Sequence, residues 1–473
     1  MTTISKNTSS AKQKSNSGSI NKNSKPDRAT LRSYQMGFGD CFLLTFHYGA
    51  EARHILIDFG STGKPDDAPS DLMLQVANDI RQRCNEKLHI VVATHRHKDH
   101  ISGFATNEER NASGDIIRQC SPDLVIQPWT EDPNAPVDAT NSVTITRDDT
   151  DKTKDKTIPF SDTLGDMQTV AEMIKAVAER IKKEGRTQSG SREMAALADQ
   201  LGFLGDDNIS NRSAIENLIE MSAGGRGLYV SADLDKPRKE LSDLLPGVKV
   251  WVLGPPNLEQ SKKITKMRSS DAAEFWQLSA DAGKAVSKNQ SKPLFAHVAT
   301  RSMAHLMPPH TRWFIRRMDS MQGAQMLEIV RILDSVMNNT SVILLFEVGG
   351  KKLLFPGDAQ IENWSYALDK ARNDPEFKKL LEDVDVFKVG HHGSRNANPK
   401  SLWEMFKKRN SAPAEKRLQT FVSTMEGKHG DSEKKTEVPR VSLVEALQAQ
   451  SDYFSTQQLE RGELGRDFPI DLH

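Results

Sequence analysis

The sequence predicts a layered domain of mixed α and β structure, and three observations support this fold class. Short runs of β-branched and apolar residues recur along the chain at the length of strands. An amphipathic helix stands between two of the early runs, so the order is strand, strand, helix, strand. Several runs end in Asp or His, which places polar side chains where strands end. A layered α/β or α+β core is the arrangement that this order favours.

The composition excludes several classes of partner and compartment. At 473 residues the chain has room for two or three average domains, or for one large domain with insertions. Lys plus Arg and Asp plus Glu both number 64, so the net charge is zero. The chain as a whole therefore has no electrostatic field that would attract nucleic acid or an acidic membrane. The longest apolar runs, such as 342–346, are too short to span a bilayer, and the N-terminus lacks the apolar core of a signal peptide. We expect a soluble protein without a membrane partner.

The cysteines also bear on the compartment. The chain has three of them, Cys41, Cys84 and Cys120, and they are scattered along the sequence without metal-ligand spacing. An odd number of scattered cysteines is typical of a reduced, cytoplasmic protein with small buried thiols. A disulfide framework is not expected.

A polar leader precedes the first expected strands. Residues 1–28 are almost all small or polar and cannot bury enough apolar surface to offset the entropy of ordering, so a disordered tail is expected. The domain itself is expected over 29–473. Apolar runs at 42–46 and 54–57 are typical of a hairpin, and Asp58 ends the second run.

A helix and a third strand come next. Residues 71–84 carry Leu72, Val76 and Ile80 at helical spacing, which predicts a helix packed against a sheet. The run at 88–93 is then the strand that leads into a group of polar residues. This arrangement places that group at the end of a buried strand.

The polar group consists of ligand-type side chains, namely His95, His97, Asp99 and His100. Three imidazoles and a carboxylate within six residues cannot share one face of a helix or strand, so they must converge from a loop at the strand's end. Nitrogen and oxygen ligands without a thiolate suit zinc, with manganese or iron as competitors. The alternative is a polar surface turn, which a single histidine would favour. Beside such a cluster, Asp58 can orient an imidazole.

The rest of the chain contains further strands and two largely helical insertions, expected at about 130–225 and 258–337. Apolar residues over 164–181 recur at three- and four-residue spacing, which predicts an amphipathic helix in the first insertion. Further strands are expected at 123–127, 227–231, 248–253, 341–347, 352–355, 384–389 and 419–423, and later helices at 399–408 and 441–450. The strand at 352–355 runs into Asp358, and the strand at 384–389 runs into a Gly-His-His-Gly-Ser segment.

The motifs at these strand ends resemble those of the metallo-β-lactamase fold superfamily. The matching residues are Asp58 after the second strand, the H-x-H-x-D-H run, Asp358 in a Gly-Asp pair and His391 at a further strand end. The finer likeness is to the hydrolase domain of ComEC-type competence proteins. It rests on residues 37–40, 338–341, 354–358 and 388–394, and it spans roughly residues 31–425 with the insertions between.

The resemblance implies a four-layer αββα sandwich with two metal ions at one edge of its sheets. The metal ligands implied are His95, His97, Asp99, His100, Asp358 and His391. Within this set Asp358 would bridge the two ions. His391 is preferred to His392 because it comes first after the strand, where the family's last histidine usually stands. His392 and Ser394 are then expected to face the substrate or to support the ligands.

The chain departs from the family in its first metal site. Many members have a third histidine for that ion, yet no histidine lies between His100 and His297. The site is then either poor in ligands or completed from the second insertion by a residue such as His305 or His310. Two other features of the competence proteins are missing. We expect no membrane channel in this sequence, and Val438-Pro439 stands where a His-Pro pair is expected, with His429 nearby.

The chemistry expected of two divalent ions is hydrolysis. Water shared by two ions is acidic enough to be hydroxide near neutral pH, and it attacks an electrophile whose oxygens the ions hold. Asp99 and Asp358 would both lie beside that water, so either can take part in proton transfer. We expect a binuclear zinc hydrolase, with manganese possible, that acts on a phosphodiester or nucleotide as a phosphodiesterase or nuclease. The alternatives are an acyl hydrolase and a regulatory subunit with weakened catalysis.

Overall fold

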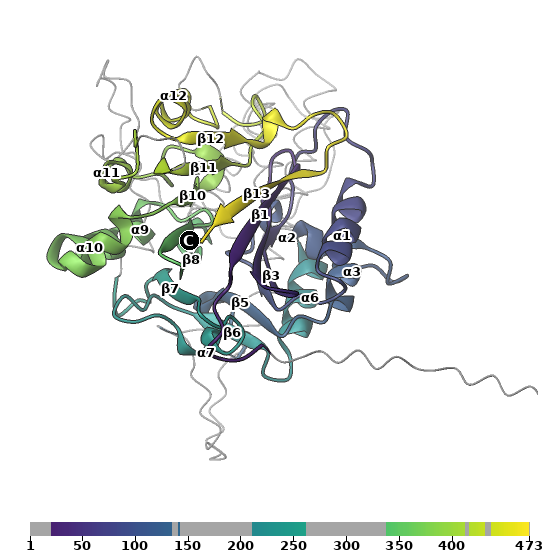
Figure 1. Ribbon diagram of the computed structural model, residues 1–473. Coiled ribbons are helices and arrows are strands. Elements are labelled where there is room, and N and C mark those ends of the chain that lie inside the picture. Colours follow the sequence, from purple (N-terminus) through teal and green to yellow (C-terminus); the bar gives the residue numbers. More distant parts are fainter. Residues whose placement is uncertain are drawn as a thin grey trace, which may run out of the picture.

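The computed structural model describes residues 20–134, 141, 211–261, 337–411, 416–430 and 437–472. Over these ranges the protein is a mixed α+β structure with two multi-stranded sheets (Figure 1), which confirms the expected fold class at that level. The helix expected over 164–181 and the histidines His305 and His310 lie outside the described residues. Among the helices that the structure describes, none has the length and apolar character needed to cross a membrane.

The strand order differs between the two sheets. The seven-stranded sheet has the order β13-β1-β2-β3-β4-β5-β6, and the six-stranded sheet has the order β12-β11-β10-β9-β8-β7. The strands of the first sheet are β1 (Arg28–Tyr34), β2 (Cys41–Tyr48), β3 (Glu51–Phe59), β4 (Ile90–Val92), β5 (Leu124–Pro128), β6 (Gly227–Val230) and β13 (Gly465–Asp471). Those of the second are β7 (Lys249–Gly254), β8 (Ile343–Val348), β9 (Lys351–Phe355), β10 (Val386–Lys388), β11 (Gln419–Val422) and β12 (Asp452–Ser455).

Each sheet contains a parallel part. β3, β4, β5 and β6 pair in parallel in the first sheet, and β9, β10, β11 and β12 do so in the second. The remaining pairs are antiparallel, including the β2–β3 hairpin that the sequence predicts. Because parallel strands bring their carboxyl ends to one edge of a sheet, residues that follow β3, β4, β9 and β10 can converge.

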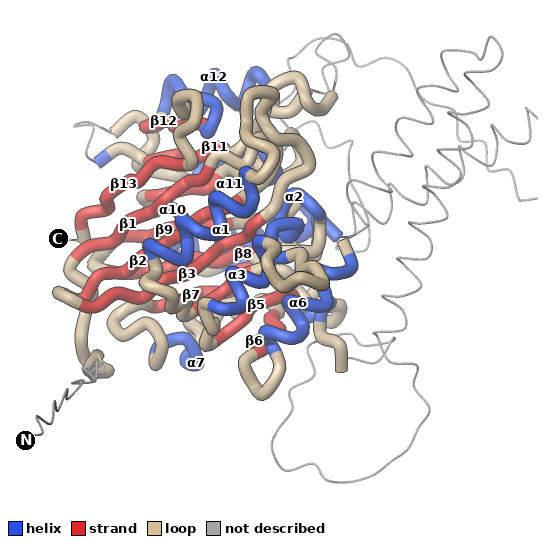
Figure 2. Tube along the Cα trace, turned by 90° about the vertical axis from the view of Figure 1, so that its right-hand side faces the viewer, coloured by secondary structure: helices blue, strands red, loops and turns tan. Residues whose placement is uncertain are grey.

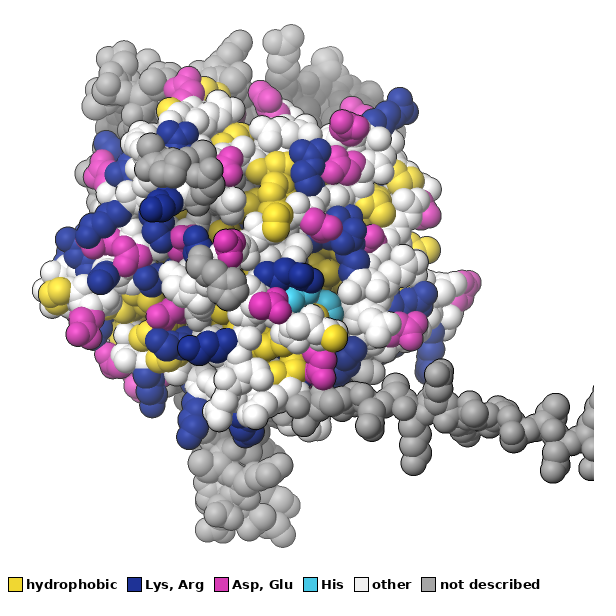
Figure 3. All heavy atoms as spheres, in the orientation of Figure 1, with side chains coloured by type: hydrophobic (Ala, Val, Ile, Leu, Met, Phe, Trp, Pro, Cys, Tyr) yellow, Lys and Arg dark blue, Asp and Glu magenta, His cyan; other side chains and the backbone are white. Residues whose placement is uncertain are grey.

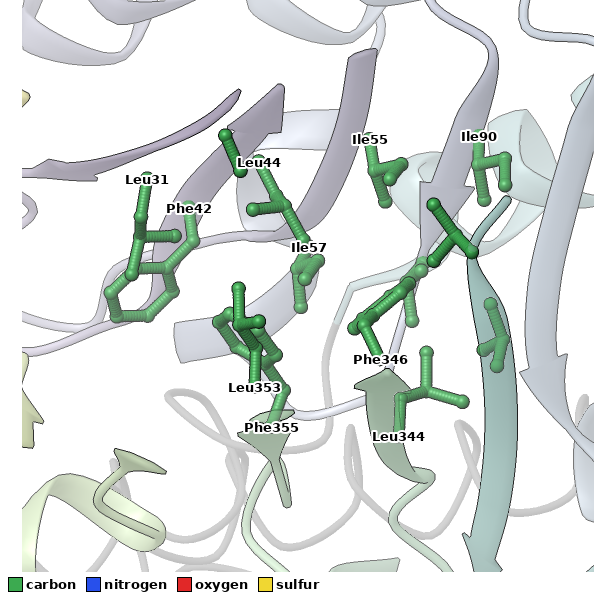
Figure 4. Packing of buried hydrophobic residues seen from close by; sticks show 14 of the residues in the cluster. Leu31, Phe42, Leu44, Ile55, Ile57, Ile90, Leu344, Phe346, Leu353 and Phe355 are labelled. Carbon is green, nitrogen blue, oxygen red and sulfur yellow. The ribbon is translucent and has the colours of Figure 1, made fainter. Parts of the chain in front are cut away.

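Side chains alternate between two faces along each strand, and this alternation builds separate cores. Phe42 and Leu44 of β2 lie in the core between the two sheets, whereas Leu43 lies on the other face of its sheet. In β9, Leu353 and Phe355 point to the core between the sheets. Figure 4 shows these residues of the two sheets facing one another. Both faces of each sheet are covered, which explains why the strands are continuous apolar runs in the sequence.

Helices cover the outer face of each sheet. Those that pack on the seven-stranded sheet are α1 (Leu72–Arg83), α3 (Ser113–Gln119) and α6 (Arg212–Ser222). Those that pack on the six-stranded sheet are α9 (Ile361–Asn373), α10 (Pro375–Glu382), α11 (Lys400–Met405) and α12 (Val441–Gln450). Figure 1 shows the two groups on opposite sides of the sheets, and Figure 2 shows α1, α3 and α6 on the side that faces the viewer. Two short helices, α2 (Lys98–Ile101) and α7 (Lys239–Ser242), complete the described set.

The structure changes three boundaries expected from the sequence. The tail was expected to reach residue 28, but β1 begins at Arg28, which pairs with both His47 and Asp471. The backbone N–H of Asp27 also donates to the His47 carbonyl at 2.9 Å. The end of the leader is therefore held by strand pairing, and its first 19 residues lie outside the described part.

The second change concerns the insertion expected at 130–225. Its described end, α6, buries Ala214, Leu218 and Met221 in the cluster on the seven-stranded sheet. This helix therefore belongs to the helices that cover the sheet. The third change is at the C-terminus, where β12 and β13 had not been expected. β13 is an edge strand that tolerates Pro469, because a residue on the edge need not donate a hydrogen bond to a further strand.

Candidate metal centre

The ligand-type residues come together at the carboxyl ends of four strands. Asp58 stands at the end of β3, residues 94–100 follow β4, Asp358 follows β9, and His392 follows β10. The two sheets meet at this edge, where the backbone N–H of Val342 donates to the Thr94 carbonyl at 2.9 Å. Gly357 makes the approach possible, since a Cβ at that position would lie 2.7 Å from the Thr94 side chain. The site therefore depends on both sheets.

Four buried side chains form the centre of the site: Asp99, His100, Asp358 and His392. One potential ligand atom from each lies within 4.8 Å of the others. His100 Nε2 lies 3.0 Å from Asp358 Oδ1, and His392 Nε2 lies 3.0 Å from Asp99 Oδ2. Two carboxylates and two imidazoles in this arrangement match the oxygen and nitrogen ligands that zinc or manganese takes in proteins. We call these four residues the central cluster.

The other two histidines of the H-x-H-x-D-H run lie next to the central cluster. His95 Nε2 is 3.0 Å from His97 Nδ1 and 3.9 Å from Asp358 Oδ2. Burial lowers the pKa of His95 well below its usual value, and the neighbouring His100 and His97 lower it further. A neutral imidazole is the form that binds a metal. Asp358 therefore lies between two groups of potential ligands, where a bridging carboxylate was expected.

Asp58 contacts His100 on the side of the imidazole that faces away from Asp358. Its Oδ1 accepts the Thr94 backbone N–H at 2.8 Å, and its Oδ2 lies 2.8 Å from His100 Nδ1. These contacts direct His100 Nε2 toward Asp358, which is how an outer carboxylate orients a ligand imidazole. Asp58 also adopts a left-handed backbone conformation with φ of 55°, which is strained for a residue with a side chain. Asp58 therefore lies where a carboxylate can orient the imidazole of His100.

His391 and His392 occupy different surroundings, and the difference reverses the preference drawn from the sequence. His392 is fully buried, and its Nδ1 lies 2.8 Å from the Ser423 carbonyl oxygen while Nε2 faces Asp99. His391 is 27% exposed, and its Nε2 lies 3.7 Å from Asp358 Oδ2. The geometry therefore favours His392 as the member of the cluster, with His391 at its open side.

The physical reason for this reversal is the backbone of the turn after β10. Both histidines have left-handed conformations, with φ of 47° at His391 and 51° at His392, so strand alternation no longer decides which way they point. Ser394 closes the turn, where its backbone N–H donates to the His391 carbonyl at 2.7 Å. Its side-chain hydroxyl is buried and has no hydrogen-bond partner among the described residues.

Two buried charged residues of the site had no role assigned from the sequence. Lys388 Nζ contacts Asp40 Oδ2 and lies 3.7 Å from Asp358 Oδ1. Burial disfavours the ammonium ion, but Asp40 and Asp358 raise the pKa of Lys388 above its ordinary value. Asp40 in turn lies 3.6 Å from both His100 and His392. A lysine that ends an otherwise apolar strand is the signal that could have identified this pair.

Asp40, Asp58 and His100 form a second group whose potential ligand atoms lie within 4.8 Å of one another. Asp40 already contacts the Lys388 ammonium, and Asp58 already bonds Thr94 and His100. Because these oxygens are occupied by the protein's own cation and donors, this group is better described as support for the central cluster. The central cluster is therefore the stronger candidate for binding an ion.

An aromatic ring lines the site beside His392. The Phe38 ring centroid lies 4.3 Å from that of His392 and 4.1 Å from that of His429. Burial lowers the pKa of His429 to about 4, so its imidazole is neutral at physiological pH. His429 forms an isolated bridge with Val438. The loop after β11 therefore brings a histidine to this side of the site from a different position in the sequence.

A buried ion pair stabilises the loop of residues 94–100 that follows β4. The Arg96 guanidinium donates from Nε to Glu131 Oε1 at 2.9 Å and from Nη2 to Oε2 at 2.5 Å. Arg96 lies between two of the ligand-type histidines, and Glu131 follows β5. The pair therefore connects the loop after β4 to the end of the neighbouring strand.

No protein-family model matches the chain, and no curated protein matches it either.

Proposed function

We propose that this protein is a metal-dependent hydrolase of the metallo-β-lactamase fold, and that it acts on phosphodiesters. The observation that carries the proposal is the convergence of Asp99, His100, Asp358 and His392 within 4.8 Å at the edge where both sheets meet. Side chains of this kind, buried and gathered from three separate loops, are typical of catalytic metal sites.

The residues present fit a divalent ion. Asp99 Oδ1 and Asp358 Oδ2 are buried carboxylate oxygens with no hydrogen-bond partner among the described residues. Four buried carboxylates surround the site: Asp40, Asp58, Asp99 and Asp358. Among the described residues, Lys388 is the only lysine or arginine that forms an ion pair with any of them, and its partners are Asp40 and Asp358. Buried carboxylate oxygens are costly unless they are paired or coordinate a metal, so the two unbonded oxygens of Asp99 and Asp358 favour a bound cation.

Asp99, His100, His392 and Asp358 would hold one ion, and His95 and His97 would hold a second that shares Asp358. Zinc suits this ligand set, and manganese is the closest competitor. A bound divalent ion would supply Lewis acidity, which lowers the pKa of a coordinated water and offsets negative charge on a substrate oxygen.

The protein's own groups then have separate tasks. Asp58 holds the imidazole of His100 by its Nδ1 atom. Asp99 keeps Oδ1 available to accept a proton, because its Oδ2 is engaged by His392. His391, at the open side, can contact the substrate.

A phosphodiester is the substrate class that this arrangement favours. Its nonbridging oxygens are negative, and bound divalent ions would offset that charge. The chain has equal numbers of acidic and basic residues, and Figure 3 shows both kinds interspersed on the face that it presents. The described residues on that face therefore form no broad positive surface for a long duplex. We therefore propose a short oligonucleotide, a single strand or a cyclic nucleotide as substrate.

The layer order supports the proposed fold family. Helices, two sheets and further helices follow one another, with the ligand-type residues at one edge. We propose that this is the αββα sandwich of the metallo-β-lactamase superfamily, in the variant found in the hydrolase domain of ComEC-type competence proteins.

The test is metal analysis followed by substrate comparison. We expect the purified protein to carry about one to two equivalents of zinc or manganese. With either metal it should hydrolyse bis-p-nitrophenyl phosphate faster than a lactone or a β-lactam, and a chelator should remove that activity reversibly. Turnover of acyl substrates alone would favour the acyl-hydrolase alternative. Metal binding without turnover would favour a regulatory subunit, and a protein that binds neither ion would refute the proposal.

A further inference from the structure

A cleft with a volume of about 270 Å³ lies outside the metal centre, and no member of the central cluster lines it. Four segments far apart in the sequence form its walls. They are the turn between β1 and β2, the loop from β3 into α1, the residues after β11, and the connection between β12 and β13. Small-molecule pockets have volumes of roughly 300–1,000 Å³, so the cleft has room for one small molecule.

The cleft adjoins the residues that contact His392. Thr424 lines the cleft and follows Ser423, whose carbonyl oxygen lies 2.8 Å from His392 Nδ1. Gly37 also lines it and precedes Phe38, whose ring centroid lies 4.3 Å from that of His392. The cleft is therefore a neighbour of the metal centre, and single residues of the chain separate the two.

Hydrogen bonds between the four segments fix the shape of the cleft. Gln35 Nε2 donates to the Thr456 carbonyl at 2.7 Å, and the backbone N–H of Gln35 donates to the Leu464 carbonyl at 2.8 Å. After β11, the backbone N–H of Glu426 donates to Gln457 Oε1 at 2.7 Å. The cleft is thus formed by the fold itself, as small-molecule sites usually are.

The inner part of the cleft combines apolar walls with an unpaired hydroxyl. Leu72, Leu459 and Leu464 contribute apolar surface. Thr424 is 1% exposed, and its hydroxyl oxygen has no hydrogen-bond partner among the described residues. A buried polar group without a partner costs free energy. A ligand that brings a polar group to the Thr424 hydroxyl would remove this cost.

The outer part of the cleft carries more negative than positive charge. Asp67, Glu460 and Glu463 line it together with one guanidinium, that of Arg461. Arg461 Nε lies 3.3 Å from Asp67 Oδ2, and Glu463 Oε2 lies 2.7 Å from Arg466 Nη2. Glu460 is exposed and forms no ion pair with any residue that the structure describes. An anionic ligand is therefore disfavoured, whereas a cation can pair with Glu460.

We propose that this cleft binds a small organic amine with an apolar body and a second polar group. The ammonium pairs with Glu460 at the outer part, the body lies against the three leucines, and the second polar group bonds the Thr424 hydroxyl. This inference goes beyond the proposed hydrolase and does not depend on it, because none of these residues belongs to the metal centre.

The experiment titrates the full-length protein with tyramine, which has an ammonium, an aromatic body and a phenol, and measures binding by calorimetry. We expect a Kd of about 1 mM for a ligand of this size. Phenethylamine lacks the phenol, and tyrosol has a hydroxyl in place of the ammonium. Each should bind about two- to five-fold more weakly than tyramine, which is the range of one hydrogen bond or one exposed ion pair. The anion para-hydroxyphenylacetate should bind most weakly.

Two variants locate the site. Glu460→Gln should bind tyramine and tyrosol equally, and Thr424→Val should bind tyramine and phenethylamine equally. Thr424→Val should also melt no lower than the natural chain, because it removes a buried hydroxyl that has no partner. The matched control is Glu108→Gln, which changes an exposed carboxylate outside the cleft and should keep both preferences. Because Glu460 is exposed, its variant tests the proposal even if Thr424→Val does not fold.

An amine can also coordinate a metal ion, so the titration is repeated after treatment with a chelator. Equal affinity before and after treatment supports a site in the cleft. The proposal is wrong if tyramine binds no more tightly than para-hydroxyphenylacetate, if either folded variant keeps the preference of the natural chain, or if the chelator abolishes binding. Metal content and hydrolysis are measured separately, so failure of this proposal leaves the proposed hydrolase untouched.

Discussion

Two groups of histidines lie at opposite ends of β3 and β4, and their surroundings differ in charge. At the amino ends, His89 Nδ1 accepts the backbone N–H of His54 at 3.1 Å, and Arg53 lies 3.2 Å from His89 Nε2. At the carboxyl ends, His100 lies 2.8 Å from Asp58 and 3.0 Å from Asp358. All three histidines are buried. The same two strands therefore present buried imidazoles to a cation at one end and to carboxylates at the other.

The pKa values differ accordingly. Burial lowers the pKa of His54 to about 4 and that of His89 to about 3, and nearby positive charges act in the same direction. Burial also disfavours the charged form of His100, but Asp358, Asp58 and Asp99 raise its pKa well above the ordinary value. A buried histidine alone is thus a neutral packing residue. Neighbouring carboxylates are what distinguish a candidate metal centre, and four predictions test this difference.

The largest effect is expected from Asp358→Ala. This carboxylate lies between the two groups of potential ligands, so its removal should abolish hydrolysis and reduce the bound metal while the fold is retained. Steady-state kinetics, elemental analysis and circular dichroism measure these quantities. The matched control is Asp243→Ala, which removes an exposed carboxylate and should change none of them. Full activity in Asp358→Ala would place the active site elsewhere.

Lys388→Met should be the most damaging change to the stability of the metal-free protein. It leaves Asp40 and Asp358 buried without their cation, and breaking a buried ion pair typically costs about 3–5 kcal/mol. Urea unfolding of the metal-free protein measures the loss. Adding Asp40→Asn should recover part of it, because the orphaned charge is removed. No recovery in the double variant would mean that Lys388 acts through packing alone.

A smaller effect is expected from Asp58→Ala. Because Asp58 orients His100 without joining the central cluster, metal affinity or activity should fall by about 10- to 100-fold. Metal titration and kinetics give this value. Asp58→Asn should retain part of the function, since an amide oxygen can still accept the His100 N–H. A loss as complete as that of Asp358→Ala would show that Asp58 is itself a ligand.

The smallest effect is expected in the pH dependence of stability, through His54 and His89 at the amino ends of β3 and β4. His54 and His89 have folded pKa values of about 4 and about 3, below the unfolded value of about 6.5. The unfolded chain therefore binds protons first as the pH falls below about 6.5, and each histidine should lower stability by up to about 1.4 kcal/mol per pH unit down to its folded pKa. His47, Arg53 and Lys87 are the charged or titratable neighbours that keep these values low.

The measurement is urea unfolding between pH 7 and pH 5 for the natural chain and for the double variant His54→Asn and His89→Asn. Asparagine keeps an acceptor near the position of Nδ1, where His89 receives the backbone N–H. The stability of the double variant should depend less steeply on pH. Equal slopes for the two proteins would mean that these histidines titrate normally, and the comparison between the two ends of the strands would fail.

Local patterns account for much of the fold. Short continuous apolar runs predicted most of the strands, including β2, β3, β8 and β9, because a strand that is buried on both faces needs apolar residues at consecutive positions. β13 was not predicted, because an edge strand may contain Pro and charged residues. The segments expected as insertions were recognised by their helical periodicity, and α6, at the end of one of them, proved to cover a sheet.

The sequence by itself determined which residues of the site are of ligand type and that they follow strand ends, because parallel strands bring those ends to one edge. It also predicted that Asp58, which ends the strand beside the histidine run, lies within reach of an imidazole, and its Oδ2 lies 2.8 Å from His100 Nδ1. Only the tertiary structure decided that His392 rather than His391 enters the central cluster and that Lys388 pairs with Asp40. Left-handed turns and contacts between distant segments set these two outcomes, and neither leaves a periodic signal in a single sequence.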